Sequence, residues 1–507
     1  MGEESRFDVV VVGAGGSGLA AAVSAAEGGA RVVALERREE PGGTTRIAVG
    51  SFTANRTRMQ AGAGISDALD DHADDVGRFA PPEIEARNNA DLRRYFLSHG
   101  AETLEWLRGL GLAFHGPSPE PPNRVPRMHN VVPGARAYIE TLSAKLLELG
   151  GVIVCGADVE RLRMEGSRVV GVSARCSGEV RHYDADLGVV LAAGDYANAP
   201  DLIARHKGKE FARIEGINPH AEGGGHRLVE QAGGALVNMD VTYGPELRFV
   251  APARPSIQQL LPSRGPLGWI LKRSIPLVPD MFLRGFVKRL VVTWQHPEDA
   301  LFTDGAILIN SRAERFCNEL RSPGREIAVG KQPDRVAYVL LDKRLSRRYR
   351  EWPHFISTAP RIAYAYVHDY LRLRPDIAVR KGSLEELARS RGLSAEALVA
   401  TVAAFNRDAE AQRDDRWGRG DARQSFIDGD WVLLGPAKAY FTTTEGGAAI
   451  DEQFRVLSPE GCPIEGLHAV GQNGLGGQVL WGHGLHIGWA MTSGRRVGKV
   501  LTQKGGS

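Results

Sequence analysis

Residues 8–18 read Asp-Val-Val-Val-Val-Gly-Ala-Gly-Gly-Ser-Gly, an apolar run followed by a glycine-rich turn. Small, helix-forming residues come next, and a second apolar run then ends at Glu36. This order predicts a strand, a turn, a helix and a second strand, which form one βαβ unit. We expect Gly13 to allow the tight turn, Gly15 to let the backbone approach a pyrophosphate, and Gly18 to let the helix sit close to the sheet.

Glu36 follows Gly18 by eighteen residues and ends the second predicted strand. A carboxylate at this place accepts hydrogen bonds from ribose hydroxyls and repels a 2′-phosphate. The free N–H groups and the positive dipole end of the helix suit the phosphate charge. The motif, its flanking strands and the acid together predict dinucleotide binding. The alternative is an ordinary glycine turn in an α/β protein.

The bulk properties narrow the class of protein. The chain has 507 residues, too many for one hydrophobic core, so we expect two or three lobes. Its 63 basic and 61 acidic residues give a net charge of +2 and no electrostatic case for nucleic acid. The four cysteines have no metal-binding spacing, and no signal peptide precedes the first strand. We therefore expect a cytoplasmic protein without metal ligands.

Residues 41–51 read Pro-Gly-Gly-Thr-Thr-Arg-Ile-Ala-Val-Gly-Ser. Together with the first motif and Glu36, this stretch resembles the flavoprotein family of fumarate reductase, succinate dehydrogenase and 3-ketosteroid dehydrogenase. In that family such a turn passes along the flavin ring, and some members attach FAD covalently through a histidine in it. This sequence has Thr44, Thr45 and Arg46 there and no histidine. The resemblance therefore implies non-covalent FAD.

Further marks of the same family extend the resemblance over nearly the whole chain. Residues 314–319, Glu-Arg-Phe-Cys-Asn-Glu, closely resemble its cap signature, and residues 464–471 resemble its closing segment, which supplies flavin contacts. A closing helix over residues 488–497 should aim its N-terminus at the flavin, where a helix dipole stabilises the anionic reduced ring. The resemblance thus implies an α/β fold, with a Rossmann-like FAD-binding domain that carries an inserted α+β cap domain.

The FAD-binding domain is expected in two parts, residues 1–240 and 428–507, with the cap, or substrate, domain at residues 241–427. From the glycine motif and the resemblance, the predicted FAD-binding residues are Gly13, Gly15, Gly16, Ser17, Gly18, Glu36, Arg37, Gly42, Gly43, Thr44, Thr45, Ala157, Val159, Ala193, Gly194, Gly471, Gln472, Gly484 and Ile487.

Residues 266–294, inside the expected cap, are rich in apolar residues but interrupted by charged ones. No run in this segment approaches the ~20 apolar residues that a membrane-spanning helix needs. Ordinary cap core is one interpretation. The other is an apolar lip that admits a greasy substrate or makes a peripheral contact with a membrane.

The substrate-gripping residues of soluble fumarate reductases do not transfer to this chain. Where that group places two histidines and an arginine, this sequence has residues 442–444, Tyr243 to Gly244, and a position near Trp481. A site that lacks paired cations is poorly suited to a dicarboxylate, because charge-assisted bidentate pairs are the usual way to hold one.

We therefore predict an FAD-dependent oxidoreductase that removes or adds hydrogen across a carbon–carbon bond next to a carbonyl. The expected substrate is a bulky apolar enone such as a steroid, terpenoid or polyketide, and the electron donor or acceptor is unknown. The alternatives are a fumarate reductase-like reductase of a small unsaturated acid, a flavin-dependent oxidase or monooxygenase, and a flavoprotein that is not an enzyme.

Two histidines are the leading candidates for proton transfer. Residues 480–486 read Leu-Trp-Gly-His-Gly-Leu-His, between a glycine-rich loop and the closing helix. We predict that His483 or His486 donates or accepts the substrate proton. We also expect the dipole of the following helix to disfavour the imidazolium form. The alternative is that both histidines pack beside the ring or bond backbone carbonyls.

Three further residues are weaker candidates. Tyr243 and Tyr440 flank the presumed flavin face and are candidates to polarise a carbonyl. Arg325 follows the cap signature and is a candidate proton-path residue, with a cap-surface role as the favoured alternative.

Overall fold

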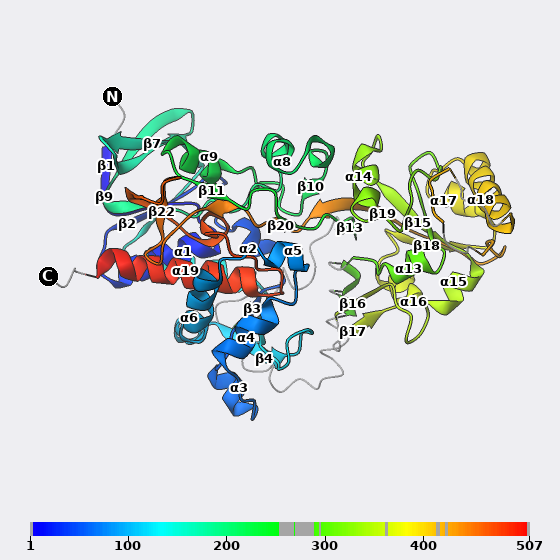
Figure 1. Cartoon of the computed structure of the whole chain (residues 1–507), viewed down its shortest axis with the longest axis horizontal. Coiled ribbons are helices and arrows are strands. Elements are labelled where there is room, and N and C mark those ends of the chain that lie inside the picture. Colours follow the sequence, from blue (N-terminus) through cyan, green and yellow to red (C-terminus); the bar gives the residue numbers. More distant parts are fainter. Residues whose placement is uncertain are drawn as a thin grey trace.

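The structure is a computed structural model that describes residues 4–252, 268, 288–289, 291–293, 296–359, 363–411, 416–420 and 424–503. The apolar segment 266–294 lies almost entirely outside the described residues, so its expected roles stay predictions. Among the described residues, no helix has both the length and the apolar character needed to cross a membrane. Figure 1 shows two lobes arranged along the longest axis of the molecule.

An eight-stranded sheet forms the centre of the first lobe. Its strands are, along the main path, β22 (Arg455–Leu457), β23 (Pro463–Ala469), β9 (Glu179–Leu191), β1 (Glu4–Val12), β2 (Val32–Glu36) and β6 (Val152–Cys155), with β8 (Arg168–Cys176) on β9 and β7 (Ala157–Glu165) on β8. Strand β1 lies between β9 and β2 and is parallel to both. Residues 9–12 are almost fully buried, as the unbroken run of valines predicts for a central parallel strand.

Helices α1 (Gly16–Glu27) and α19 (Leu485–Thr502) pack against each other although they come from opposite ends of the chain (Figure 1). Helix α19 contains the closing helix that the sequence predicts over residues 488–497. The contact depends on a glycine, because a Cβ atom at Gly494 would lie 2.2 Å from the backbone oxygen of Ser17. The two backbones can therefore touch only because this position has no side chain.

A small antiparallel sheet lies in the same lobe, with strand order β3 (Ser51–Thr53), β5 (Met128–Val132) and β4 (Ala113–Ser118). Apolar residues at mostly three-to-four spacing over residues 89–110 predict a helix, and α6 (Ala90–Gly109) confirms it. The side chain of Asn89 caps this helix by accepting the Leu92 N–H. The loop between β4 and β5 carries Glu120, which contacts a residue of the pocket wall.

The second lobe is built on a six-stranded sheet with the path β10 (Glu215–Gly216), β19 (Trp431–Phe441), β15 (Ala337–Leu341) and β14 (Ile307–Ile309), to which β13 (Glu246–Phe249) and β18 (Ala378–Lys381) are paired through β19. The outgoing and returning segments pair between the lobes, where β12 (Thr242–Tyr243) lies antiparallel to β20 (Thr443–Thr444). The pairing continues into the second lobe, where β13 lies antiparallel to β19. The chain thus leaves the first lobe and returns to it side by side.

The remaining elements are α2 (Gly43–Ile47), α3 (Arg58–Gly62), α4 (Leu69–Val76), α5 (Pro82–Glu85), α7 (Arg136–Glu148), α8 (Pro200–His206), η1 (Lys209–Phe211), α9 (Gly224–Gln231), β11 (Leu236–Val237), α13 (Ala300–Thr303), α14 (Gly324–Lys331), α15 (Lys343–Arg348), β16 (Ser357–Ala359), β17 (Ala363–Ala365), α16 (Val367–Leu373), α17 (Leu384–Ser390), α18 (Ala395–Glu410), β21 (Gly447–Ala448) and η3 (Gly471–Gly474).

The buried apolar side chains form two clusters, one in each lobe. The second cluster also takes in Tyr196, Leu202 and Ile214, which precede residue 240 in the sequence. The packing between the lobes therefore begins before the boundary expected at residue 240, and both expected boundaries stay predictions.

Replacing Gly494 with alanine is expected to lower the free energy of unfolding by ~1–3 kcal/mol, because the new Cβ has no room beside the Ser17 carbonyl. The melting temperature measures this loss. Gly109→Ala is the control, since a Cβ at Gly109 would meet no atom within 4 Å. An unchanged melting temperature for Gly494→Ala would contradict the close contact between α1 and α19.

Candidate active site

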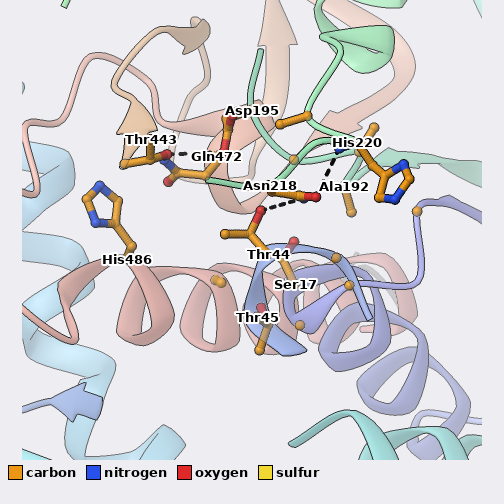
Figure 2. Close-up of a pocket in the computed structure, with 18 of the residues that line it drawn as sticks. Ser17, Thr44, Thr45, Ala192, Asp195, Asn218, His220, Thr443, Gln472 and His486 are labelled. Atoms are coloured by element: carbon orange, nitrogen blue, oxygen red, sulfur yellow. Dashed lines mark hydrogen bonds between the residues drawn. The ribbon is translucent and has the colours of Figure 1, made fainter. Parts of the chain in front are cut away.

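A long pocket crosses the first lobe, and both ends of the chain line it. Its walls come from the turn after β1, the end of β2, helix α2, residues 157–159 and 192–195, and residues 482–487. Figure 2 shows His220 and His486 at opposite ends of this pocket, with Ser17, Thr44 and Thr45 between them.

The glycine turn presents bare backbone to the pocket. A Cβ at Gly13 would lie 2.5 Å from the carbonyl oxygen of Ala192, and one at Gly18 would lie 1.9 Å from that of Gly13. At Gly15, which lines the pocket, the nearest atom would be 3.8 Å away. Helix α1 begins here without a side-chain cap, so its first N–H groups are left for an anion such as a pyrophosphate.

Glu36 is buried at the far end of the same turn. Its Oε2 accepts the N–H of Ala14 and its Oε1 accepts the N–H of Arg38, both at 3.0 Å. Each carboxylate oxygen can accept a second hydrogen bond, which suits a ribose hydroxyl. The neighbouring Arg37 lines the pocket and donates to Glu222 at 2.6 Å.

Most of the predicted FAD-binding residues line this pocket. They are Gly13, Gly15, Gly16, Ser17, Glu36, Arg37, Gly43, Thr44, Thr45, Ala157, Val159, Ala193, Gly194, Gln472, Gly484 and Ile487. Gly18, Gly42 and Gly471 do not line it and instead shape the backbone behind it. A Cβ at Gly471, for example, would lie 2.5 Å from the Ser17 hydroxyl oxygen. The cradle therefore fits FAD, with the dinucleotide along the glycine turn.

His483 and Glu120 form a close pair at the end of the pocket opposite Glu36. The ring Nδ1 of His483 lies 2.5 Å from Glu120 Oε1, and the His483 backbone N–H donates to the same oxygen at 2.8 Å. Solvent reaches 52 % of the His483 side chain, which lines the pocket, while protein surrounds the rest of the ring.

Burial alone would disfavour the charged form of His483, but the hydrogen bond to Glu120 and its negative charge outweigh burial and raise the pKa of His483. The expectation that the helix dipole disfavours the imidazolium is therefore wrong for His483. A carboxylate in direct contact has a stronger effect than the N-terminus of α19.

His486 and Glu445 form a second pair, one helical turn further along. His486 Nε2 lies 2.8 Å from Glu445 Oε1, and the side chain of Glu445 is completely buried. Glu445 Oε2 also accepts the N–H of Leu480 at 3.1 Å, so the carboxylate is held on both sides. This arrangement fixes the orientation of the His486 ring at the pocket wall.

Tyr243 and Arg248 complete this end of the pocket. The Tyr243 ring stacks on Trp481 with centroids 5.4 Å apart. Burial raises the pKa of Tyr243, and its hydroxyl has no hydrogen-bond partner among the described residues, so it stays a protonated donor. Arg248 Nη2 donates to Glu246 at 2.7 Å and to Thr442 at 3.1 Å.

A polar chain lies beside His486 (Figure 2). The Thr443 hydroxyl donates to Asp195 at 3.2 Å and accepts from the Gln472 amide at 2.6 Å. Burial raises the pKa of Asp195, which is almost fully buried. This chain ties the strand that returns from the cap to the segment that precedes α19.

Two predicted candidates do not line this pocket. Tyr440 sits on β19, and burial raises its pKa to about 12. Arg325 is buried in α14 of the second lobe, where it pairs with Asp299 at 2.8 Å and Glu326 at 2.6 Å. Sequence reasoning, in turn, missed Glu120, Glu445 and Arg248.

Comparison with known proteins fits this geometry. The profile of the FAD_binding_2 family, described as "FAD binding domain", matches residues 8–250 and 288–479. This chain belongs to that family. The predicted cofactor, FAD, and the predicted class, an FAD-dependent oxidoreductase related to fumarate reductases, are thereby confirmed.

Several relatives are 24 % identical to this chain. An NADH:fumarate oxidoreductase from Klebsiella pneumoniae (strain 342) matches over 92 % of this chain, which spans only 44 % of that longer protein. A fumarate reductase (cytochrome) from Shewanella frigidimarina matches over 93 % of this chain and 74 % of its own length. A 4-oxocyclohex-2-ene-1-carboxylate 5-dehydrogenase from Sinomonas cyclohexanicum matches over 98 % and 94 %.

Solved structures show the same fold. The open conformation of a flavocytochrome c3 fumarate reductase superposes with a TM-score of 0.72 at 22 % identity, covering 98 % of this chain and 78 % of that one. A 3-ketosteroid delta1-dehydrogenase from Sterolibacterium denitrificans superposes with a TM-score of 0.64 at 18 % identity, covering 98 % and 99 %. The predicted α/β fold with a cap lobe is therefore confirmed.

We expect Glu36→Gln to weaken FAD binding by ~10–100-fold, since hydrogen bonds to a charged group contribute roughly 1.5–3 kcal/mol. Fluorescence titration of the apoprotein with FAD measures the Kd. The exposed Glu39 nearby gives the control Glu39→Gln, which should leave the Kd unchanged. Equal Kd values for both variants would remove the ribose role of Glu36.

We also expect FAD to be held without a covalent bond, because the turn at residues 44–46 has no histidine. Acid precipitation of the protein should then leave all flavin absorbance in the supernatant. Yellow colour in a washed pellet would contradict this prediction.

Proposed function

We propose that this protein transfers hydrogen across a carbon–carbon bond next to a carbonyl of an uncharged, largely apolar molecule such as a cyclic enone. The observation that carries this proposal is the pairing of charges at the end of the pocket beside α19. There, among the residues that the structure describes, each cationic or titratable basic side chain on the wall has a carboxylate partner within the protein.

The pairs are short and at least partly buried. Arg248 lies 2.7 Å from Glu246, His483 2.5 Å from Glu120, and His486 2.8 Å from Glu445. A substrate carboxylate would have to displace one of these partners and leave that partner's own negative charge unpaired, which is unfavourable. Sequence analysis did not identify Arg248 as a cation on the pocket wall. Because Arg248 is paired with Glu246, the argument against a dicarboxylate substrate still holds.

Polar and aromatic groups at the same place suit a neutral carbonyl compound. The protonated hydroxyl of Tyr243 is a hydrogen-bond donor for a carbonyl oxygen. The Tyr243 ring, which lines the pocket and is backed by Trp481, gives a flat apolar surface there. Binding through one donor and one apolar wall needs no charge on the substrate.

When bound, FAD accepts or supplies the hydride. The residues of the chain handle the proton. In the direction of reduction, His483 holds the proton that the substrate receives, because its pKa is raised by Glu120. In the direction of dehydrogenation, the same His483 nitrogen takes the proton back. His486, through the ring nitrogen that Glu445 does not engage, is the alternative carrier for both directions.

Reduction of a small unsaturated acid is the second candidate function. The presence of Arg248 on the pocket wall favours it, as do the printed names of the fumarate-reducing relatives. In either case we propose a small-molecule substrate and a separate electron donor or acceptor. The cytoplasmic location and the membrane contact of residues 266–294 stay predictions.

The two candidates are separated by oxidation of the reduced protein. We expect 2-cyclohexen-1-one to reoxidise the photoreduced flavin faster than fumarate does, because the described residues leave no unpaired cation on this part of the wall to bind a dicarboxylate. Stopped-flow absorbance under anaerobic conditions measures both rates. A clearly faster reaction with fumarate would reject the apolar-substrate proposal.

We expect His483→Ala and His486→Ala to retain FAD and to slow flavin reduction or reoxidation by ~10²–10⁴-fold, the usual loss when a general acid or base is removed. FAD content and melting temperature check the fold. His115→Ala, at an exposed position on β4, is the control and should keep the wild-type rate. If both pocket variants also keep that rate, neither histidine transfers the proton.

The pH dependence of the rate of substrate reduction should follow the ionisation of His483. Because Glu120 raises the pKa of His483, the rate of substrate reduction is expected to be constant at low pH and to fall as pH rises through that pKa. In Glu120→Gln the fall should begin at lower pH. An identical profile in this variant would exclude His483 as the acid.

A further inference from the structure

Glu120 reaches His483 from a loop, residues 119–127, that connects β4 with β5. The two residues are 363 positions apart in sequence, and only 7 % of Glu120 is exposed. A loop is usually the least fixed part of a fold, yet this one has to bring a carboxylate to one ring nitrogen. Contacts elsewhere in the protein must therefore hold the loop with Glu120 beside His483.

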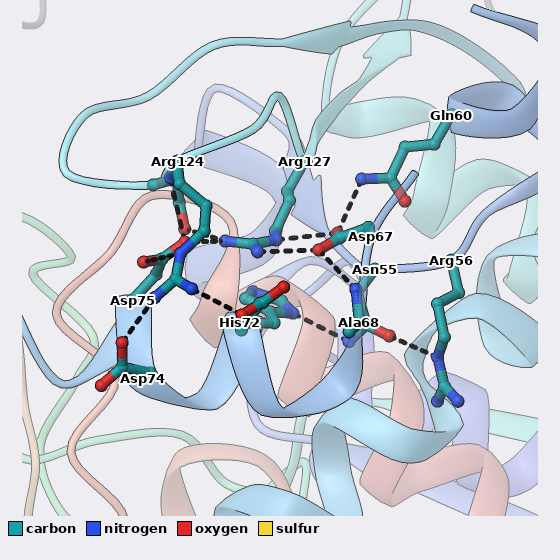
Figure 3. A network of polar contacts seen from close by, with 12 residues as sticks. Asn55, Arg56, Gln60, Asp67, Ala68, His72, Asp74, Asp75, Arg124 and Arg127 are labelled. Atoms are coloured by element: carbon teal, nitrogen blue, oxygen red, sulfur yellow. Dashed lines mark hydrogen bonds and ion pairs between the residues drawn. The ribbon is translucent and has the colours of Figure 1, made fainter. Parts of the chain in front are cut away.

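Two arginines at the end of the loop are bound to helix α4 and the residues before it (Figure 3). Arg127 is completely buried, and its guanidinium lies between Asp67 and Asp75. Two of its nitrogens bind Asp67 at 2.8 Å each, and a third binds Asp75 at 2.6 Å. We call Asp67, Asp75, Arg124 and Arg127 the Asp–Arg cluster.

Arg124 adds a second attachment within the cluster. Its side chain and its backbone N–H each donate to Asp75 at 2.9 Å, so both oxygens of that carboxylate are used. The rest of its guanidinium reaches Asp71 and Asp74 on the exposed side of α4. The loop is thus fixed both at a side chain and at its backbone.

A chain of hydrogen bonds leads from the cluster to Glu120. Arg127 Nη1 donates to the side-chain oxygen of Asn123 at 2.9 Å. The backbone N–H of Asn123 donates in turn to the carbonyl oxygen of Glu120, also at 2.9 Å. Each step is a direct bond, so the chain connects the cluster to the backbone of Glu120.

We propose that the Asp–Arg cluster positions Glu120 against His483 and thereby favours the charged, hydrogen-bond-donating form of His483 on the pocket wall. This inference rests on the proposed role of His483. Its members are positioning residues, since none of them lines the pocket. Buried ion pairs are a poor source of stability, and holding a functional loop in one position is a use for them.

The charges that face His483 are few. Glu120 approaches from the loop, and Arg248 and Glu246 from β13. His486, in the first turn of α19, lines the same pocket. His72 is buried beside the cluster, and burial followed by the charge of Arg127 lowers its pKa to about 3, so it stays neutral. The charge state of His483 therefore depends mainly on the position of the Glu120 carboxylate.

The test is a direct titration of His483 by NMR in FAD-loaded protein with 13C-labelled histidine, with His483→Gln used to assign the signal. Glu120→Gln should lower the pKa of His483 by ~1–3 units, the usual effect of losing a contacting opposite charge. Arg124→Gln and Asn123→Ala should lower it in the same direction by a smaller amount. The melting temperature shows that each variant is folded during the titration.

Asp70→Asn is the matched control, because Asp70 lies on the same helix but pairs with Arg94 outside the cluster. It should leave the pKa of His483 unchanged. If Glu120→Gln shifts the pKa while Arg124→Gln and Asn123→Ala do not, the cluster is only structural and the inference is overturned. If all shifts occur but His483→Ala keeps wild-type flavin kinetics, the cluster does position Glu120 against His483, and it is the proposed catalytic role of His483 that fails.

Discussion

A contact of backbone with backbone is the constraint on which this molecule depends. The turn after β1 passes so close to Ala192, at the end of β9, that only glycine fits at position 13. The same closeness at Gly18 brings α1 down onto the sheet, and α19 then packs on α1 through Gly494. Because α19 is placed in this way, the segment before it, with its two histidines, faces the same pocket as the phosphate-binding turn.

The parts of this arrangement that depend on short stretches of sequence were predictable. A valine run, a glycine turn and an acid at a fixed distance specify β1, α1, β2 and Glu36, since each of them follows from neighbours in the chain. The helices α6 and α19 likewise follow from apolar spacing and from the family resemblance. The local sequence pattern was therefore sufficient to predict the part of the pocket that binds a ligand mainly through backbone groups.

The chemistry of the pocket was less predictable because its partners are distant in sequence. Glu120 and Glu445 lie in segments that carry no recognisable catalytic motif, and only folding brings them to His483 and His486. The helix-dipole argument failed at His483 for this reason. It included the dipole of the following helix and could not include the carboxylate of Glu120, which comes from the distant loop between β4 and β5. Arg248 was missed because nothing in the sequence shows that β13, which follows Tyr243, also reaches the pocket.

The pairing of charges at the proposed substrate end also bears on how molecules arrive there. A site whose cations are matched by carboxylates a few ångströms away projects only a weak field into solution, since the two contributions cancel within a Debye length. Long-range attraction then does little to guide an incoming molecule. Capture of a substrate becomes a matter of ordinary diffusion and of how often the pocket is accessible, and its rate is largely indifferent to ionic strength.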